Sequence, residues 1–105
     1  MKVKKKDFYT HIIFYNSDSR DDLKITIDSF SDMDNLIIDI KSENINKEQL
    51  VLSFLKHSTL WKKKNKSVIF VVNDSKIDYD KEIICLPTLD EAVEYLYMEE
   101  LERNV

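Results

Sequence analysis

Two histidines and three carboxylates are the residues that acid–base or metal chemistry would use in this sequence. His11 and His57 fall in separate segments. The carboxylates fall near the ends of expected strands or loops, where α/β sheets often place their sites: Asp39, Glu43 and Asp90. Metal-dependent hydrolysis needs several ligands close together, and no spacing here supplies them. We interpret His11 as a packed histidine, His57 as an exposed helix residue and Asp39 as a capping or ion-pairing residue, and expect no catalytic residue, metal or cofactor.

A run of lysines after Trp61 is the pattern that suggests nucleic-acid binding. Lysines contact phosphates and an indole stacks on bases, so the candidate patch consists of Trp61, Lys62, Lys63, Lys64 and Lys66. The net charge of the chain is −4, however, which argues against general affinity for nucleic acid. The lysines also end a predicted helix, where they favour the negative end of its dipole. We therefore keep an RNA-associated role as the alternative function.

The C-terminal segment predicts a helix with a well-defined start. Pro87 fixes its own φ and ends the preceding strand. Thr88 stands at the N-cap position, and Glu91 three residues later completes a capping box. Apolar residues recur at spacings of three and four up to about Arg103. The expected buried stripe is Leu89, Ala92, Val93, Leu96, Tyr97 and Leu101.

The outer side of this helix suggests a protein interface. Tyr95 and Met98 lie off the buried stripe among glutamates, and aromatic and methionine side chains are enriched in binding surfaces. The interface candidates are Tyr95, Met98, Leu101 and Glu102. We expect a protein partner, or a homodimer formed through this helix or the apolar strand before it.

Length and composition indicate a single domain of 105 residues. With 43% apolar residues, the chain can build one modest core. No stretch is long and apolar enough for a membrane span or a signal peptide, so we expect a cytoplasmic protein. Residues 1–6 are expected to form a flexible basic tail. The chain has no glycine and hence no glycine-based phosphate loop, and no small-molecule ligand is evident.

Four apolar runs predict strands at Phe8–Tyr15, Leu36–Ile40, Ser67–Val72 and Glu82–Leu86. The middle two are continuous rather than alternating, as in the covered strands of a mostly parallel sheet. Parallel strands need crossovers, which we assign to helices in residues 19–33 and 46–64, although residues 23–27 also alternate like a strand. The segment between the last two strands is too short and polar for a packed helix. The expected fold is α/β, a mostly parallel four-stranded sheet with three helices in the order β-α-β-α-β-β-α.

The segment from Asn35 to Asp74, followed by residues 86–96, resembles a STAS domain, the fold of bacterial anti-sigma-factor antagonists. The shared pattern is a strand ending in an aspartate, a short loop, a helix, a strand ending near Val-Asn and a last helix introduced by a threonine. The resemblance covers most of residues 8–98. It implies a regulatory domain that binds proteins.

In that family the helix after the short loop begins with a phosphorylatable hydroxyl, where phosphate meets free backbone N–H groups. The family pattern places Asn46 at its aspartate, Lys47 at its phosphorylated serine and Glu48 at the second hydroxyl. The resemblance therefore implies a STAS-like domain without that phosphorylation switch.

The ending "PTLDEAVEYLYMEELER" resembles that of small proteins of Bacteroidetes-type bacteria that are commonly labelled ribonuclease Z. The tRNA-processing enzymes of that name hold two metal ions in a dense His and Asp motif. The two histidines here lie in different elements and form no His-x-His-x-Asp-His run. We therefore expect a non-catalytic STAS-like module that binds a protein partner or itself, rather than an enzyme.

Overall fold

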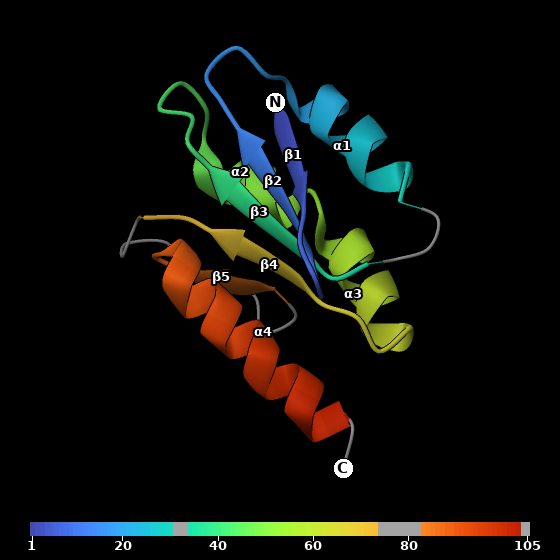
Figure 1. The fold of residues 1–105 in the computed structure, drawn as a ribbon. Helices are drawn as coiled ribbons and strands as arrows, with labels where there is room; N and C mark the ends of the chain where they lie inside the picture. Colours follow the sequence, from blue (N-terminus) through green and yellow to red (C-terminus); the bar gives the residue numbers. More distant parts are fainter. Residues whose placement is uncertain (31–33, 74–82, 104–105) are drawn as a thin grey trace.

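The computed structural model describes residues 1–30, 34–73 and 83–103 and has an α/β architecture (Figure 1). Within these ranges, one five-stranded sheet carries four helices. The strands are β1 (Lys2–Lys5), β2 (Thr10–Phe14), β3 (Leu36–Ile40), β4 (Val68–Val71) and β5 (Ile84–Leu86), and the helices are α1 (Arg20–Asp28), α2 (Lys47–Leu52), α3 (Leu55–Lys63) and α4 (Leu89–Arg103). The α/β class is as expected, with one more strand and one more helix than the sequence predicts.

The strands stand in the sheet in the same order as in the chain, β1-β2-β3-β4-β5. Strands β2, β3, β4 and β5 run parallel to one another, whereas β1 runs antiparallel to β2. In the β2–β3 pair, Thr10 stands opposite Leu36 and Phe14 opposite Ile40. The expectation of a mostly parallel sheet is confirmed.

The lysine-rich N-terminus is an edge strand, so the expectation of a flexible tail over residues 1–6 is wrong. Strand β1 pairs with β2 so that Lys4 stands opposite His11, and all four of its residues are exposed. Lysines on an edge strand discourage pairing with another chain. Strand β2 begins at Thr10 rather than Phe8, because residues 6–9 connect the two strands and the Lys6 N–H donates to the Tyr9 carbonyl at 2.8 Å.

Side-chain caps begin both α1 and α2. The Asp22 N–H donates to Ser19 Oγ at 3.1 Å, and the Gln49 N–H donates to Asn46 Oδ1 at 3.0 Å. These bonds satisfy backbone donors that a helix start leaves unpaired. The helix chosen for residues 19–33 is confirmed over α1, and residues 31–33 lie outside the described residues.

The helix expected over residues 46–64 is divided into α2 and α3. The break falls at Phe54, whose backbone is not helical (φ −105°, ψ 16°) and whose side chain is buried. Helix α3 is followed by Asn65 at φ 59°. That left-handed position is one that glycine usually takes, and asparagine is the common substitute in a chain that has no glycine.

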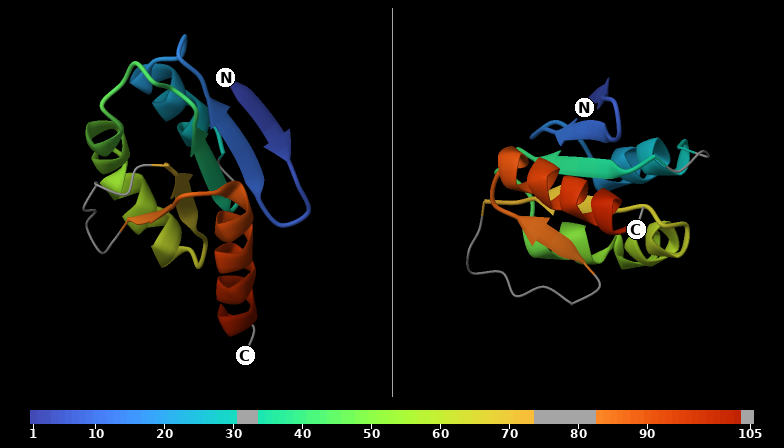
Figure 2. Two further views of the ribbon diagram at one scale, coloured as in Figure 1. Left: turned by 90° about the vertical axis from the view of Figure 1, so that its left-hand side faces the viewer. Right: turned by 60° about the horizontal axis from the view of Figure 1, so that its bottom comes forward.

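Two apolar layers lie on opposite faces of the sheet (Figures 1 and 2). Helices α1, α2 and α3 cover one face, and its main buried residues are Ile12, Phe14, Leu23, Ile27, Leu36, Ile38, Leu50, Val51, Phe54, Trp61, Val68 and Phe70. Helix α4 packs on the other face, over Ile37, Ile69 and Val71. Right-handed crossovers between successive neighbouring strands all pass on the same side, which explains why α1 to α3 share one face.

Helix α4 begins at the expected cap, because the Glu91 N–H donates to Thr88 Oγ1 at 3.2 Å. Ala92 and Leu96 are fully buried against the sheet, as predicted. The prediction is wrong for Tyr97 and Leu101, whose residues are 55% and 48% exposed. The helix therefore turns a different side toward the sheet in its second half.

The last strand is thinly covered. Ile83 is buried, but all three residues of β5 are only half-buried. The expected absence of a helix between the last two strands falls on residues 74–82, which lie outside the described residues.

Candidate functional site

Two residues that the sequence singles out for chemistry, His11 and Asp39, lie together between adjacent strands. His11 Nε2 is 3.3 Å from Asp39 Oδ2, and only 5% of His11 and 4% of Asp39 is exposed. Lys41 Nζ lies 3.7 Å from the same carboxylate oxygen. Buried charges are tolerated when they are paired, so this contact ties β2 to β3. It matches the pairing role expected for Asp39.

A cavity of about 340 Å³ opens at the carboxyl ends of the parallel strands, where α/β sheets often bind ligands. Its charged lining residues are Asp39, Lys41, Glu43 and Lys47. The structure thus brings together two of the three carboxylates, while Asp90 is exposed in the first turn of α4. Two cations and two anions balance one another here, so the cavity offers no dominant charge for a ligand.

The residues that match the family switch loop have separate environments. Asn46 caps α2, Lys47 lines the cavity at the strand ends, and Glu48 is exposed in the first turn of α2. At the position where the resemblance expects a phosphorylated hydroxyl, this chain has a lysine beside the cavity.

Trp61 cannot stack on a base, because only 3% of it is exposed. Its indole N–H donates to the Asp34 carbonyl at 2.9 Å and so fixes the ring in the core. The interpretation of Trp61 as part of a nucleic-acid patch is wrong. Lys62, Lys63 and Lys64 are exposed and Lys66 is half-buried. Lys62 and Lys66 also line a cavity beneath α3.

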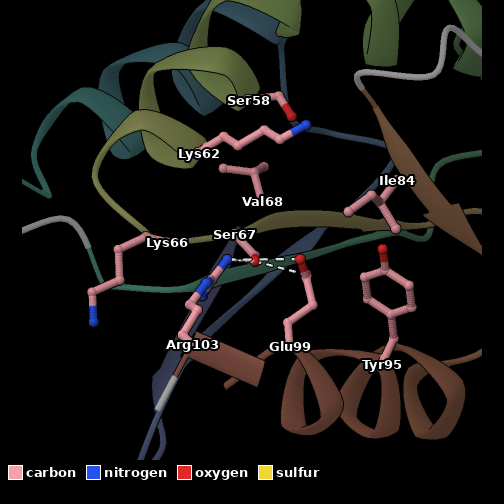
Figure 3. Close-up of a pocket in the computed structure, with 9 residues that line it drawn as sticks. All are labelled: Ser58, Lys62, Lys66, Ser67, Val68, Ile84, Tyr95, Glu99 and Arg103. Carbon is pink, nitrogen blue, oxygen red and sulfur yellow. Dashed lines mark hydrogen bonds and ion pairs between the residues drawn. The ribbon is translucent and has the colours of Figure 1, made fainter. Parts of the chain in front are cut away.

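That cavity, of about 130 Å³, lies between α3, the start of β4 and the second half of α4 (Figure 3). Its lining residues are Ser58, Lys62, Lys66, Ser67, Val68, Ile84, Tyr95, Glu99 and Arg103. Figure 3 shows the Glu99 carboxylate and the Arg103 guanidinium meeting beside Ser67. The charged groups at this end of the cavity therefore already have partners within the protein.

A network that we call the Arg103 cluster (Asn35, Ser67, Glu99, Glu100 and Arg103) fixes the end of α4 to the sheet. Arg103 Nη2 donates to Ser67 Oγ at 2.6 Å, and Nη1 donates to Glu100 Oε1 at 3.2 Å. Ser67 Oγ donates to Glu99 Oε1 at 2.8 Å, and Asn35 Nδ2 donates to Glu100 Oε1 at 2.7 Å. Asn35 and Ser67 are buried directly before β3 and β4. These polar partners explain why polar residues face inward here.

The opposite flank of α4 carries an apolar groove of about 460 Å³, lined by Phe8, Val93, Glu94, Tyr97 and Met98. The Phe8 and Tyr97 rings meet edge to face with centroids 6.2 Å apart, which joins the β1–β2 connection to α4. Met98 is 58% exposed, the largest exposed fraction among the apolar residues of this groove.

Leu101, four residues after Tyr97, extends this apolar area along the helix. We call Phe8, Val93, Tyr97, Met98 and Leu101 the α4 surface. Large apolar side chains that gather rather than scatter on a surface mark interaction sites. The α4 surface is therefore the candidate functional site of this chain.

The four predicted interface residues do not share one surface. Met98 and Leu101 belong to the α4 surface, whereas Tyr95 lines the cavity with the Arg103 cluster. Burial, followed by repulsion from Glu99 and Glu102, raises the pKa of the Tyr95 hydroxyl, which places Glu102 near Tyr95. Phe8 was predicted to begin a strand and Tyr97 to lie in the buried stripe, so neither was expected on this surface.

His57 is not the exposed helix residue that the sequence suggests. Its side chain is 15% exposed, and Nε2 lies 2.8 Å from Asp28 Oδ1. The ring lies near those of Phe54 and Trp61, with centroids 5.3 and 6.2 Å away. His57 therefore joins α3 to α1.

Among the described residues, no group of three or more His, Cys, Asp or Glu is placed to hold a metal ion. No helix in the described part of the chain has the length and apolar character that crossing a membrane requires.

The chain was also compared with known proteins. No protein-family model matches it, and no curated protein matches it. The sites are accordingly interpreted from their own geometry.

Proposed function

We propose that this chain is a non-catalytic STAS-like module that acts by binding a polypeptide through the α4 surface. The observation that carries the proposal is the apolar groove along α4, with Tyr97 and Met98 more than half exposed. Interfaces are enriched in aromatic residues and methionine at their centres. Phe8 comes from a different part of the chain, so the groove depends on the folded structure.

The arrangement of elements supports the STAS-like part of this proposal. The strand that ends in Asp39-Ile40, the short loop, the helix begun by Asn46 and the last helix begun by Thr88 all occur where the resemblance implies them. The phosphorylation switch is not part of the proposal, because Lys47 and Glu48 take the two hydroxyl positions. We propose a cytoplasmic setting.

The two histidines and Asp39, which were considered for catalysis, have structural partners, which supports a binding role. His11 is paired with Asp39, and His57 with Asp28. Each pair joins two elements that are distant in sequence. The ribonuclease label therefore does not enter the proposal.

Site-specific photocrosslinking tests the proposed function. A photoreactive benzoylphenylalanine would replace Met98 on α4, and in the control it would replace Ile25, which is an exposed apolar residue on α1 across the sheet. After irradiation in native lysate, we expect a discrete polypeptide adduct, or a self-adduct, from position 98 and none from position 25. No adduct at position 98, or the same adducts at both positions, would contradict the proposal.

A further inference from the structure

We propose that the α4 surface binds a second copy of this chain in a two-fold dimer, with α4 of each protomer lying against the β1 lysines of its partner. This inference rests on the proposed function and names the polypeptide that is bound. The observation that supports this inference is the distribution of charge on either side of the apolar groove.

The exposed side of α4 is acidic. Asp90, Glu91, Glu94 and Glu102 are all exposed, and Glu94 lies within the groove itself. Arg103, the one cation of this helix, is turned inward and bonded to Ser67 and Glu100. The charge that α4 presents to a partner is therefore negative.

The other side of the groove is basic. Phe8 belongs to the connection between β1 and β2, which lies alongside α4 (Figure 2). Strand β1 and this connection carry four exposed lysines: Lys2, Lys4, Lys5 and Lys6. The apolar groove thus lies between an acidic helix and the connection that follows the basic edge strand.

The strand register assigns these lysines to faces of the sheet. Residues directly opposite each other in an antiparallel pair project on the same side. Lys4 stands opposite His11, which is bonded to Asp39 on the side that α4 covers. Lys5 stands opposite Thr10, projects to the other side and pairs with Asp34 at 3.7 Å. Lys4, rather than Lys5, therefore faces a partner that docks on the α4 side.

Two-fold symmetry makes this pattern self-complementary. In a two-fold interface both protomers use the same patch. If that patch has an acidic half and a basic half on either side of an apolar centre, the acidic half of each protomer contacts the basic half of the other. Direct antiparallel packing of α4 on its copy would instead bring Glu94 near Glu102 of the other protomer, which is unfavourable. The charges therefore favour α4 against β1 over α4 against α4.

Paired charge reversal tests the inference in purified protein. Wild type, Glu94→Lys and Lys4→Glu would be compared by sedimentation velocity over a range of concentrations and salt, with Lys5→Glu as the control on the opposite side of the same strand. Wild type should be a dimer that salt weakens. Each reversal at position 94 or 4 should raise the dissociation constant more than about tenfold, because it sets like charges together. Lys5→Glu should leave the dissociation constant unchanged.

An equimolar mixture of Glu94→Lys and Lys4→Glu should form a heterodimer again, because both contacts then join opposite charges. Circular dichroism would check that each variant is folded.

A wild-type monomer of 12.5 kDa at high concentration would overturn the inference, as would a mixture that stays monomeric. If wild type is monomeric while position 98 still crosslinks to another polypeptide, the dimer fails and the proposed function stands. If position 98 crosslinks to nothing, both fail.

Discussion

His57 Nε2 lies 2.8 Å from Asp28 Oδ1, and this contact joins α3 to the last residue of α1. The hydrogen bond from His57 is the main reason why the pKa of the Asp28 carboxyl is lowered, with Lys24 adding to the effect. The contact matters for stability because it joins two helices that cover the same face of the sheet.

The first prediction concerns acid stability. Because the pKa of Asp28 is lower in the folded than in the unfolded chain, its contribution is present above about pH 4 and is lost as pH falls through the folded pKa. Asp28→Asn should therefore be less stable than wild type at neutral pH, and the difference should shrink below about pH 4. Urea midpoints from pH 7 to pH 2.5 measure this. Asp21→Asn, an exposed change on the same helix, is the control, and parallel curves for both variants would contradict the prediction.

The second prediction concerns the buried pair between β2 and β3. Asp39→Ala leaves His11 without its side-chain partner, and an unpaired buried polar group costs about 1–3 kcal/mol. Asp39→Asn keeps an acceptor at the same position and should recover part of that loss. Urea unfolding followed by Trp61 fluorescence provides the comparison, and equal stability of the two variants would show that the hydrogen bond contributes nothing.

The third prediction concerns the Arg103 cluster. Arg103→Met keeps most of the aliphatic side chain but removes the donors to Ser67 and Glu100, so the last turns of α4 should open more often. Hydrogen exchange of backbone amides over residues 97–103 should speed up about tenfold or more, which corresponds to about 1.4 kcal/mol. Glu102→Gln, at an exposed neighbouring position, should leave the exchange rates nearly unchanged. If the exchange rates do not change in Arg103→Met, the apolar residues of α4 alone hold its end on the sheet.

The fourth prediction separates the core role of Trp61 from nucleic-acid binding. Trp61→Phe loses the hydrogen bond to the Asp34 carbonyl and should lower stability by about 1 kcal/mol or more. Because Trp61 is buried, the same change should not alter any affinity for single-stranded RNA at low salt. Lys63→Glu/Lys64→Glu should reduce whatever affinity exists and flatten its salt dependence, since those lysines are exposed. An affinity that falls with Trp61→Phe in a folded protein would restore the stacking role.

Features set by neighbours in sequence were predicted well. Thr88 was assigned as a helix cap, and its Oγ1 accepts the expected backbone N–H of Glu91. A cap bond reaches only three residues along the chain, so the sequence contains all of its determinants. The parallel strands β3 and β4 were also evident, because strands buried on both faces are apolar at successive positions.

Features set by distant residues were predicted poorly. Strand β1 has Val3 as its single apolar residue, so only its partner β2 reveals it as a strand. Tyr97 was placed in the core because its spacing fits the buried stripe, but Asn35 and Ser67 on the sheet draw Glu99, Glu100 and Arg103 inward instead. The α4 surface follows from that rotation, which no local pattern in the helix encodes.

The coincidence of strand order with chain order has a consequence for how the protein folds. Each parallel strand joins the edge formed by the strand just before it, so no strand has to insert between two that are already paired. Contacts between segments close in sequence cost little loop-closure entropy, and such topologies fold faster than those built on distant pairings. Helix α4 is the exception, because it returns from β5 to pack on β3 and β4. We expect the sheet to assemble by stepwise growth along one direction, with the docking of α4 as a late, separate event.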